Sequence, residues 1–498
     1  MKTAKARSIA LVGIEGICVQ VEAAWADGLP HTELVGLADI SLKEAQARCK
    51  AALGSSGVSW PYGRVTINLS PAYLPKMGTH FDLAICTALA ACVRDDLPEP
   101  AGVLLFGEVG LDGTVRAVRG LLPGVIAAAR QGVSRVVVPA VQMREASLVE
   151  GMDVVGVGSL AELWEVLRGG PGASMPEPVK VSTAAHGKLD LADVTGQPEA
   201  RWALEVAAAG GHHLYFHGPP GAGKTMLAER LPTLLPPLSE AQALEVSAIH
   251  SLAGEGLDAG LIQNPPYSDP HPSSSLASIV GGGAQVATPG AISLAHRGVL
   301  FLDEAPEFPP KVLDSLRAPL ESGRVVISRQ RATTVYPARF QLVLAANPCP
   351  CGKLETRGAA CKCTPQQVRK YANRISGPVL DRIDIHQHVR PLSKAFACEP
   401  AEGSAAVAQR VEMARERQRA RLSKFGMSMN CEVPGRVLRK ELPLPDVDVI
   451  EQAVRMGRLS ARGADKVLRL AWTVADLSGQ DVPGEDELNI ALAMRQGS

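Results

Sequence analysis

Gly218-Pro219-Pro220-Gly221-Ala222-Gly223-Lys224-Thr225 is the stretch that decides the fold, because it satisfies the phosphate-binding pattern G-x-x-x-x-G-K-[ST]. Residues 214–217 before it form a mainly apolar run typical of a buried strand, and residues 226–231 after it are typical of the opening of a helix. Strand, glycine-rich loop and helix thus follow in the order of a P-loop. A chance glycine-rich loop is the alternative, but the motif is complete and its flanks agree with it. We predict a parallel α/β nucleotide-binding core around this loop.

The residue types of the loop predict a nucleoside triphosphate as its ligand. Glycine lets backbone N–H groups approach phosphate oxygens closely. Lys224 would reach the β- and γ-phosphates, and the hydroxyl of Thr225 would ligate Mg²⁺. The expected cofactors are therefore ATP and Mg²⁺.

Length and composition exclude several classes of protein. The chain has 498 residues, which suggests roughly three domains. Lys+Arg and Asp+Glu both number 51, so any contact with a polyanion must come from local patches. Ten cysteines in so long a chain do not make a disulfide scaffold. No run reaches about 18 apolar residues and the basic N-terminus lacks a clear cleavage site, so we expect a cytoplasmic protein without a membrane span.

Changes of pattern divide the chain into segments. Residues 1–168 mix alternating strand patterns with short Ala-rich helices and are expected to form an α/β domain. The Gly-, Pro- and Ser-rich residues 169–188 lack periodicity, as in an exposed linker. Strands and helices alternate over 189–391 around the P-loop, and 392–498 is mainly helical, which makes it a candidate lid. The helices expected in this last segment are 407–421, 460–477 and 485–495.

A second apolar run, residues 299–302, ends in the carboxylates Asp303 and Glu304. This pattern indicates a buried strand with two acidic residues at its carboxyl end. In a P-loop fold Asp303 would hold Mg²⁺ through its water shell, and Glu304 would orient or deprotonate the attacking water. A buried strand with a solvated end is an equally good interpretation of the run alone, and the P-loop upstream favours the catalytic one.

Three further polar residues are candidates for contacts to the γ-phosphate. Asn347 follows the apolar run 342–346 and could position the lytic water, although alone it could equally be a turn residue. Arg382 and Arg462 are candidate phosphate sensors, because a guanidinium fork can stabilise charge on the transferred phosphoryl group. A surface salt bridge is the commoner role for any single arginine.

Together these residues resemble the Walker A, Walker B, sensor 1, arginine finger and sensor 2 motifs of an AAA+ ATPase. The chain most closely resembles the YifB/ComM family of magnesium-chelatase-like ATPases, and the resemblance covers nearly the whole chain. It implies a ring, expected to be hexameric, in which Arg382 enters the neighbour's active site. It also implies that Val194 to Gln197 lie near the adenine. The segments that carry the resemblance are Asp193-Val194-Thr195-Gly196-Gln197, Ala207-Ala208-Ala209-Gly210-Gly211-His212-His213, Ile292-Ser293-Leu294-Ala295-His296-Arg297-Gly298, Asn347-Pro348-Cys349-Pro350-Cys351-Gly352 and Arg374-Ile375-Ser376-Gly377-Pro378.

The N-terminal domain resembles the Lon-protease-like fold that begins these proteins. A Lon peptidase needs a serine nucleophile and a lysine that activates it. Aligned by eye, the serine position falls near His80 and the lysine position near Gly124. The domain is therefore expected to lack peptidase activity and to support assembly or substrate engagement. The segments that carry this resemblance are Asn68-Leu69-Ser70-Pro71, Phe81-Asp82-Leu83-Ala84 and Arg119-Gly120-Leu121-Leu122-Pro123.

Two pairs of cysteines follow Asn347, namely Cys349-x-Cys351 and Cys361-x-Cys363. Four thiolates could hold one Zn²⁺ tetrahedrally and brace this loop. The spacing is less typical than two C-x-x-C pairs, so four reduced thiols in a polar loop remain an equal alternative. A catalytic metal is disfavoured, because four cysteines leave no open coordination position.

Residues 324–336 are typical of two strands around a basic turn that carries Arg329 and Arg331. In related ring ATPases a hairpin here projects into the central channel, so these arginines are candidate contacts to a DNA backbone. A solvated turn is the alternative. The insertion 252–290 is the other candidate channel loop, and its Tyr267 to Pro272 depart from the family pattern.

The resemblance implies an ATP-driven motor that acts on single-stranded or branched DNA, with branch migration during natural transformation or recombination as its role. A metal-chelatase-type ATPase that remodels a protein partner is the alternative. The Lon-like front half argues against it, because chelatase motor subunits resemble only the ATPase core. An ATP-dependent protease is a third possibility, and the missing serine–lysine dyad argues against it.

Overall fold

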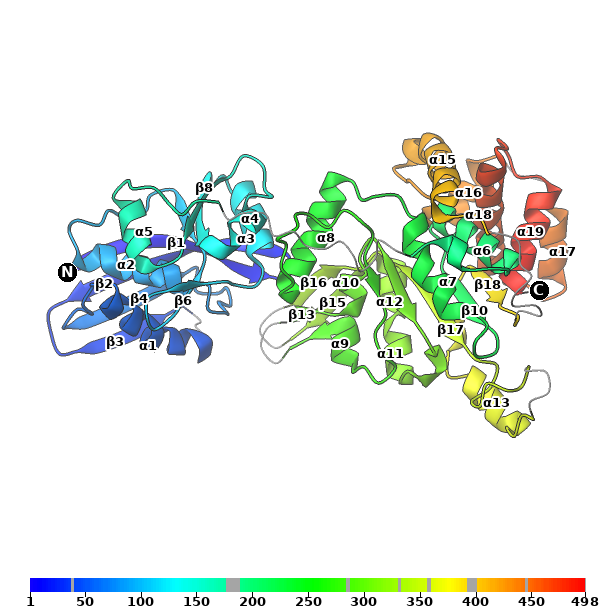
Figure 1. The fold of residues 1–498 in the computed structure, drawn as a ribbon, viewed down its shortest axis with the longest axis horizontal. Helices are drawn as coiled ribbons and strands as arrows, with labels where there is room; N and C mark the ends of the chain where they lie inside the picture. The colour runs from blue at the N-terminus through cyan, green and yellow to red at the C-terminus, as the bar shows by residue number, and fades with distance from the viewer. Residues whose placement is uncertain are drawn as a thin grey trace.

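The computed structural model describes residues 1–36, 40–175, 189–283, 287–329, 333–355, 360–391, 401–443 and 447–497. The chain forms an elongated molecule (Figure 1), with an α/β unit at the N-terminal end, the P-loop sheet in the middle and a group of helices at the C-terminal end. The mixed α/β fold with a parallel sheet and a helical C-terminal region is as predicted. Within these described ranges, no helix is long and apolar enough to cross a bilayer.

The N-terminal unit is built on a seven-stranded mixed sheet in the order β3-β4-β2-β1-β5-β8-β9. In β1, Ala4 and Ala6 are buried while Lys5 and Arg7 are exposed, which is the alternation of a sheet covered on one face. Helix α2 packs on this sheet and is apolar almost throughout. The strands are β1 (Lys2–Val12), β2 (Glu15–Ala26), β3 (His31–Val35), β4 (Arg64–Ser70), β5 (Val103–Leu105), β8 (Arg135–Pro139) and β9 (Asp153–Val157), and the helices are α1 (Ile40–Ser55), α2 (Asp82–Val93), α3 (Leu121–Arg130) and α5 (Leu160–Leu167).

The two positions aligned with a Lon-type dyad both lie beside the ring of Phe106. His80 stacks on Phe106 with ring centroids 4.6 Å apart, and its Nε2 lies 2.8 Å from the carbonyl of Ile9. A Cβ added at Gly124 would lie 3.2 Å from the same Phe106 ring. Burial lowers the pKa of His80 to about 4. Phe106 and Ile9 therefore pack against both positions.

The P-loop lies on a five-stranded parallel sheet in the order β11-β14-β17-β10-β18. Every residue of β14 and β17 is buried, as expected for strands covered by helices on both faces. Spatial order departs from chain order at β10 and β17, and in open parallel sheets ligands bind beyond the carboxyl ends of the strands at such a point. The strands are β10 (Leu214–His217), β11 (Tyr267–Ser268), β14 (Val299–Leu302), β17 (Gln341–Ala346) and β18 (Ile385–His388), and the flanking helices include α6 (Pro198–Gly210), α7 (Lys224–Arg230), α8 (Glu240–Ala253) and α12 (Arg317–Ser322).

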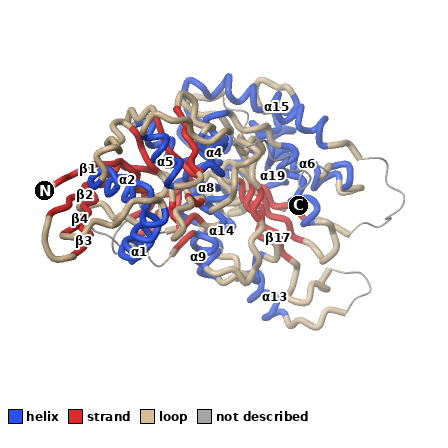
Figure 2. Tube along the Cα trace, turned by 60° about the vertical axis from the view of Figure 1, so that its left-hand side comes forward, coloured by secondary structure: helices blue, strands red, loops and turns tan. Residues whose placement is uncertain are grey.

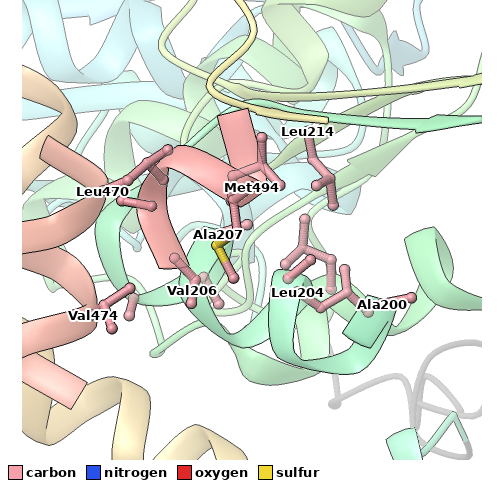
Figure 3. Packing of buried hydrophobic residues seen from close by; sticks show 14 of the residues in the cluster. Ala200, Leu204, Val206, Ala207, Leu214, Leu470, Val474 and Met494 are labelled. Atoms are coloured by element: carbon pink, nitrogen blue, oxygen red, sulfur yellow. The ribbon is translucent and has the colours of Figure 1, made fainter. Parts of the chain in front are cut away.

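The helical lid, residues 401–443 and 447–497, packs against the sheet region through a shared hydrophobic core. Figure 3 shows Val474 of the lid beside Val206 of α6, and Met494 of the lid beside Ala207 of α6. The lid is therefore joined to the P-loop domain by buried apolar surface. Its helices are α15 (Ser404–Leu422), α16 (Gly435–Lys440), α17 (Asp448–Arg455), α18 (Ala461–Ser478) and α19 (Glu485–Gln496), which include the three predicted helices.

The N-terminal unit contacts the P-loop domain through α8. The Ser251 carbonyl accepts a hydrogen bond from the Gly120 backbone at 3.0 Å, and its hydroxyl donates to Glu145 at 2.5 Å. Burial raises the pKa of Glu145. The tight turn between β1 and β2 reaches further, since a Cβ at Gly13 would lie 2.9 Å from the side chain of Thr334. The two units are thus fastened at α8 and at the 324–337 hairpin, where Figure 1 shows them meeting.

His212, at the junction of α6 and β10, predicts how stability depends on pH. It is fully buried, its Nε2 lies 2.8 Å from the Thr473 hydroxyl, and burial lowers its pKa to about 4 from 6.5. Between these values the unfolded chain binds a proton that the folded chain excludes, so acidification should remove roughly 3 kcal/mol of unfolding free energy. Urea unfolding at pH 7 and about pH 4.5 measures the total loss, to which the buried His80 and His213 also contribute, and the difference between wild type and variant gives the share of His212. We expect His212→Gln to reduce the pH dependence, and the exposed His271→Gln to leave it unchanged.

Candidate nucleotide site

Lys224 folds back onto its own loop. Its Nζ donates hydrogen bonds to the carbonyls of Gly218 and Pro219 at 2.7 and 2.9 Å, and to Asn347 Oδ1 at 3.1 Å. Burial lowers the pKa of Lys224, although the carboxylates of Asp303 and Glu304 favour its charged form. The Lys224 ammonium is thus held beside the P-loop by two carbonyls and an amide oxygen. A bound phosphate can replace them as its hydrogen-bond acceptor.

Close backbone packing explains the first glycine of the motif. Gly218 has φ 155°, and a Cβ there would lie 2.2 Å from the carbonyl oxygen of Val389. Gly223, the residue before α7, has φ 93°, in the left-handed region that glycine adopts without strain. The loop therefore takes a path that other residues would not permit.

The predicted Mg²⁺ ligands lie side by side. The Thr225 hydroxyl donates to Asp303 Oδ2 at 2.7 Å, although Asp303 comes from the end of β14 and Thr225 from the start of α7. The other Asp303 oxygen accepts a hydrogen bond from the Glu304 backbone at 2.8 Å. A hydroxyl and a carboxylate beside a phosphate-binding loop are the oxygen donors that Mg²⁺ takes in such sites.

Glu304 has the backbone conformation of a strained functional residue. Its φ is 49°, in the left-handed region that residues with a side chain rarely adopt, and its side chain is exposed. The turn separates its carboxylate from the buried strand that precedes it. Glu304 can therefore reach a water molecule beyond the end of β14.

Three strand ends bring these predicted residues together. The P-loop follows β10, Asp303 and Glu304 follow β14, and Asn347 follows β17, which is hydrogen-bonded to both. Asn347 contacts Lys224 directly. The arrangement can bind a triphosphate, hold Mg²⁺ beside it and orient a water molecule.

The segment expected near the adenine adjoins the P-loop. Gln197, with φ 55°, donates a hydrogen bond to the Ala222 carbonyl at 3.2 Å and another to the carbonyl of Arg390. A cavity of about 500 Å³ lies beside it, between α6 and the start of the lid. The lining residues include Gly196, Pro198, Trp202, Ala401 and Val407.

The two predicted arginine sensors lie together in a different place. Arg382 and Arg462 line a cavity of about 790 Å³ between the sheet region and the lid. None of the described residues that line this cavity belongs to the P-loop, and neither Asp303 nor Asn347 is among them. Arg382 instead pairs with Glu321 at the end of α12 and donates to the carbonyl of Pro378 at 2.6 Å.

Two cations of the lid hold the loop that carries Arg382. Lys466 of α18 donates to the Arg382 carbonyl at 2.8 Å and to the Asp384 carboxylate at 2.6 Å. Arg495 of α19 donates to the carbonyl of Ile383 and lies 3.5 Å from Asp381. Burial alone would raise the pKa of Asp384, but Lys466 and the nearby histidines hold it well below its usual range. Sequence reasoning missed both cations, since each lies more than 80 residues from its partner.

The four cysteines come together as predicted. The sulfur atoms of Cys349, Cys351, Cys361 and Cys363 all lie within 4.8 Å of one another. Cys349 is buried, whereas the others are partly or fully exposed. The cluster can therefore hold one metal ion.

The predicted basic hairpin forms between β15 (Arg324–Ser328) and β16 (Thr333–Pro337), and Arg329 is exposed at its tip. Arg331 lies outside the described residues. The hairpin touches the other candidate channel loop, because a Cβ at Gly281 would lie 2.8 Å from the side chain of Ile327. Sequence spacing alone does not indicate this contact.

Comparisons with known proteins agree with this architecture. Family models described as subunit ChlI of Mg-chelatase, magnesium chelatase subunit ChlI, and its C-terminal part match residues 21–142, 190–396 and 401–495. An uncharacterised protein of Mycobacterium tuberculosis is 47% identical over 502 residues, which cover 100% of this chain and 99% of that protein. Protein YifB of Escherichia coli is 39% identical over 498 residues, 98% of this chain and 96% of YifB. Competence protein ComM of Haemophilus influenzae is 38% identical over 505 residues, 99% of this chain and 98% of ComM. The chain therefore belongs to the YifB/ComM family of magnesium-chelatase-like AAA+ ATPases.

Proposed function

We propose that the protein is an ATP-hydrolysing ring motor that moves on DNA. The observation that carries the proposal is the meeting of Lys224, Thr225, Asp303 and Asn347 at the ends of three neighbouring parallel strands. Lys224 would bind the β- and γ-phosphates, and Thr225 with Asp303 would hold Mg²⁺. Glu304 would activate the attacking water, and Asn347 would position it.

Assembly into a ring, with six subunits as the expected number, completes this site. Arg382 and Arg462 share a cavity whose described lining includes no residue of the P-loop. Both would stabilise the γ-phosphate only when this cavity faces the P-loop of a neighbouring subunit. Hydrolysis would therefore require assembly.

DNA is the proposed substrate of the motor. Arg329 is exposed at the tip of a hairpin that contacts the 281–282 strand, so both candidate channel loops lie on one part of the surface. A guanidinium there can contact phosphates without reading bases. Since a relative of similar length is a competence protein, we assign this motor to branch migration during transformation or recombination, in the cytoplasm. We also assign Zn²⁺ to the four cysteines as a structural ion.

ATP turnover tests the proposal. The purified protein would be assayed with no DNA, single strands, duplex and a four-way junction, with Lys224→Ala as the blank. We expect stimulation by DNA that is greatest with the junction and falls steeply with salt, because phosphate contacts release counterions. Turnover that depends on Lys224 but ignores every DNA would reject the DNA motor and favour remodelling of a protein partner.

Arg329→Ala should weaken this stimulation. Loss of one phosphate contact per subunit should raise the DNA concentration needed for half-maximal turnover several-fold and reduce its salt dependence. Turnover without DNA should stay unchanged, because Arg329 lies on the hairpin and not at the P-loop. Arg130→Ala, an exposed arginine on α3 of the N-terminal unit, is the matched control. An equal effect of both variants would show that general charge, and not this hairpin, binds DNA.

A further inference from the structure

The spacing of the cysteine sulfurs fits one tetrahedral ion. The Sγ atom of Cys349 lies 3.4 Å from that of Cys351 and 3.8 Å from that of Cys361, and the last two are 3.6 Å apart. Zn–S bonds of about 2.3 Å in a tetrahedron place sulfurs about 3.8 Å apart. An iron–sulfur cluster needs wider spacing, because its own iron and sulfide atoms lie between the cysteines. The geometry thus favours a single thiolate-bound ion.

The cysteines connect two elements of the ATPase core. Cys349 comes two residues after Asn347 at the end of β17. Cys363 directly precedes Thr364, which caps α13 (Pro365–Ala372) by accepting a hydrogen bond from Gln367. Both views show α13 projecting from the body of the molecule (Figures 1 and 2). One ion would therefore connect the end of β17, where Asn347 lies, to the start of α13.

The residues that follow Cys351 pack closely against the P-loop. Gly352, next to Cys351, has φ 73°, and a Cβ added there would lie 2.4 Å from Cγ of Pro220. Three residues later, Glu355 pairs with His388 at 2.8 Å, and His388 ends β18 beside the P-loop strand. The chain after Cys351 is thus held against the nucleotide site at two points.

We propose that Zn²⁺ bound by Cys349, Cys351, Cys361 and Cys363 makes this loop a clasp that holds Pro220 and Asn347 in the nucleotide-binding arrangement. The ion has four protein ligands and no open position, so its role is to hold the structure. Loss of the ion would release Gly352 from Pro220 and Glu355 from His388, and would weaken nucleotide binding. The effect on nucleotide rests on the proposed ATPase function, whereas the metal site does not.

Metal content tests the site first. Protein purified under reducing conditions should contain about one zinc per chain by elemental analysis. Cys361→Ser/Cys363→Ser should lose it, and Cys18→Ser, in the N-terminal sheet, should keep it. Replacement of zinc by Co²⁺ should give the intense visible absorption of a tetrahedral thiolate site in wild type and in Cys18→Ser, but not in the double variant. Absence of zinc from the wild type, or full zinc in the double variant, would overturn the site.

Nucleotide binding tests the clasp separately. The zinc-free double variant should bind a fluorescent ATP analogue about tenfold more weakly than wild type, equivalent to ~1.4 kcal/mol. Gly352→Val should keep its zinc but bind the analogue more weakly, because its side chain would displace the loop from Pro220. Unchanged affinity in both variants would overturn the clasp while leaving the metal site intact. If wild type itself failed to bind, the ATPase proposal would fail and metal content would still decide the site.

Discussion

Lys224→Ala is expected to abolish ATP hydrolysis, with turnover reduced by at least about 10²–10³-fold, the usual cost of one pre-organised electrostatic contact. Lys224 is the cation that lies between the loop carbonyls of Gly218 and Pro219 and the Asn347 amide. Without it the phosphates lose a charge-assisted contact and the loop loses its internal brace. Turnover with Mg²⁺ and the affinity for an ATP analogue are the two measurements.

A matched variant separates the specific effect from general loss of charge. Lys311→Ala removes an exposed lysine on α11 (Pro310–Ser315) of the same core and should leave turnover unchanged. Thr225→Ala should instead impair the response to Mg²⁺, because it removes the hydroxyl that contacts Asp303. If Lys224→Ala retained normal turnover, the chemistry would have to lie elsewhere in the chain.

Much of the nucleotide site could be predicted because each part is local in sequence. An apolar strand followed by a glycine-rich loop, by two acids or by an amide places the polar group at the carboxyl end of that strand. Parallel strands then bring those ends to one edge of the sheet. The Thr225–Asp303 hydrogen bond of 2.7 Å is the outcome of this rule, although 78 residues separate the two side chains.

The contacts that hold the arginine loop could not be predicted in this way. Lys466 and Arg495 lie on amphipathic helices where a charged residue normally faces solvent. They turn inward because the lid packs on α6 and places them beside the buried Asp384 and the carbonyls of the loop. Tertiary packing, which leaves no local signal, therefore decides their role. The contact between Gly352 and Pro220 has the same origin.

The cavity that Arg382 lines is separate from the P-loop of the same subunit, so we expect Arg382 to act on a neighbouring subunit. Arg382→Ala should lower turnover by roughly 10³-fold or more, as removal of an arginine finger does, and should spare ATP binding. Unchanged binding of an ATP analogue by the variant would show that it is folded. The Arg382 side chain is 16% exposed and that of its partner Glu321 is 58% exposed, so the stability of the variant is measured beside its turnover.

Mixing subunits tests whether this arginine acts across the interface. A Lys224→Ala subunit cannot hydrolyse ATP but still offers Arg382 to its neighbour, so mixing it with inactive Arg382→Ala subunits should restore turnover. In a random equimolar ring about a quarter of the interfaces would combine an intact P-loop with an intact arginine. Lys466→Met releases the loop that carries Arg382 without contacting the P-loop. Mixing Lys466→Met subunits with Lys224→Ala subunits should therefore also restore turnover. Lys440→Met, an exposed lid lysine, should need no rescue. A mixture that stays inactive would mean that Arg382 does not serve a neighbouring site.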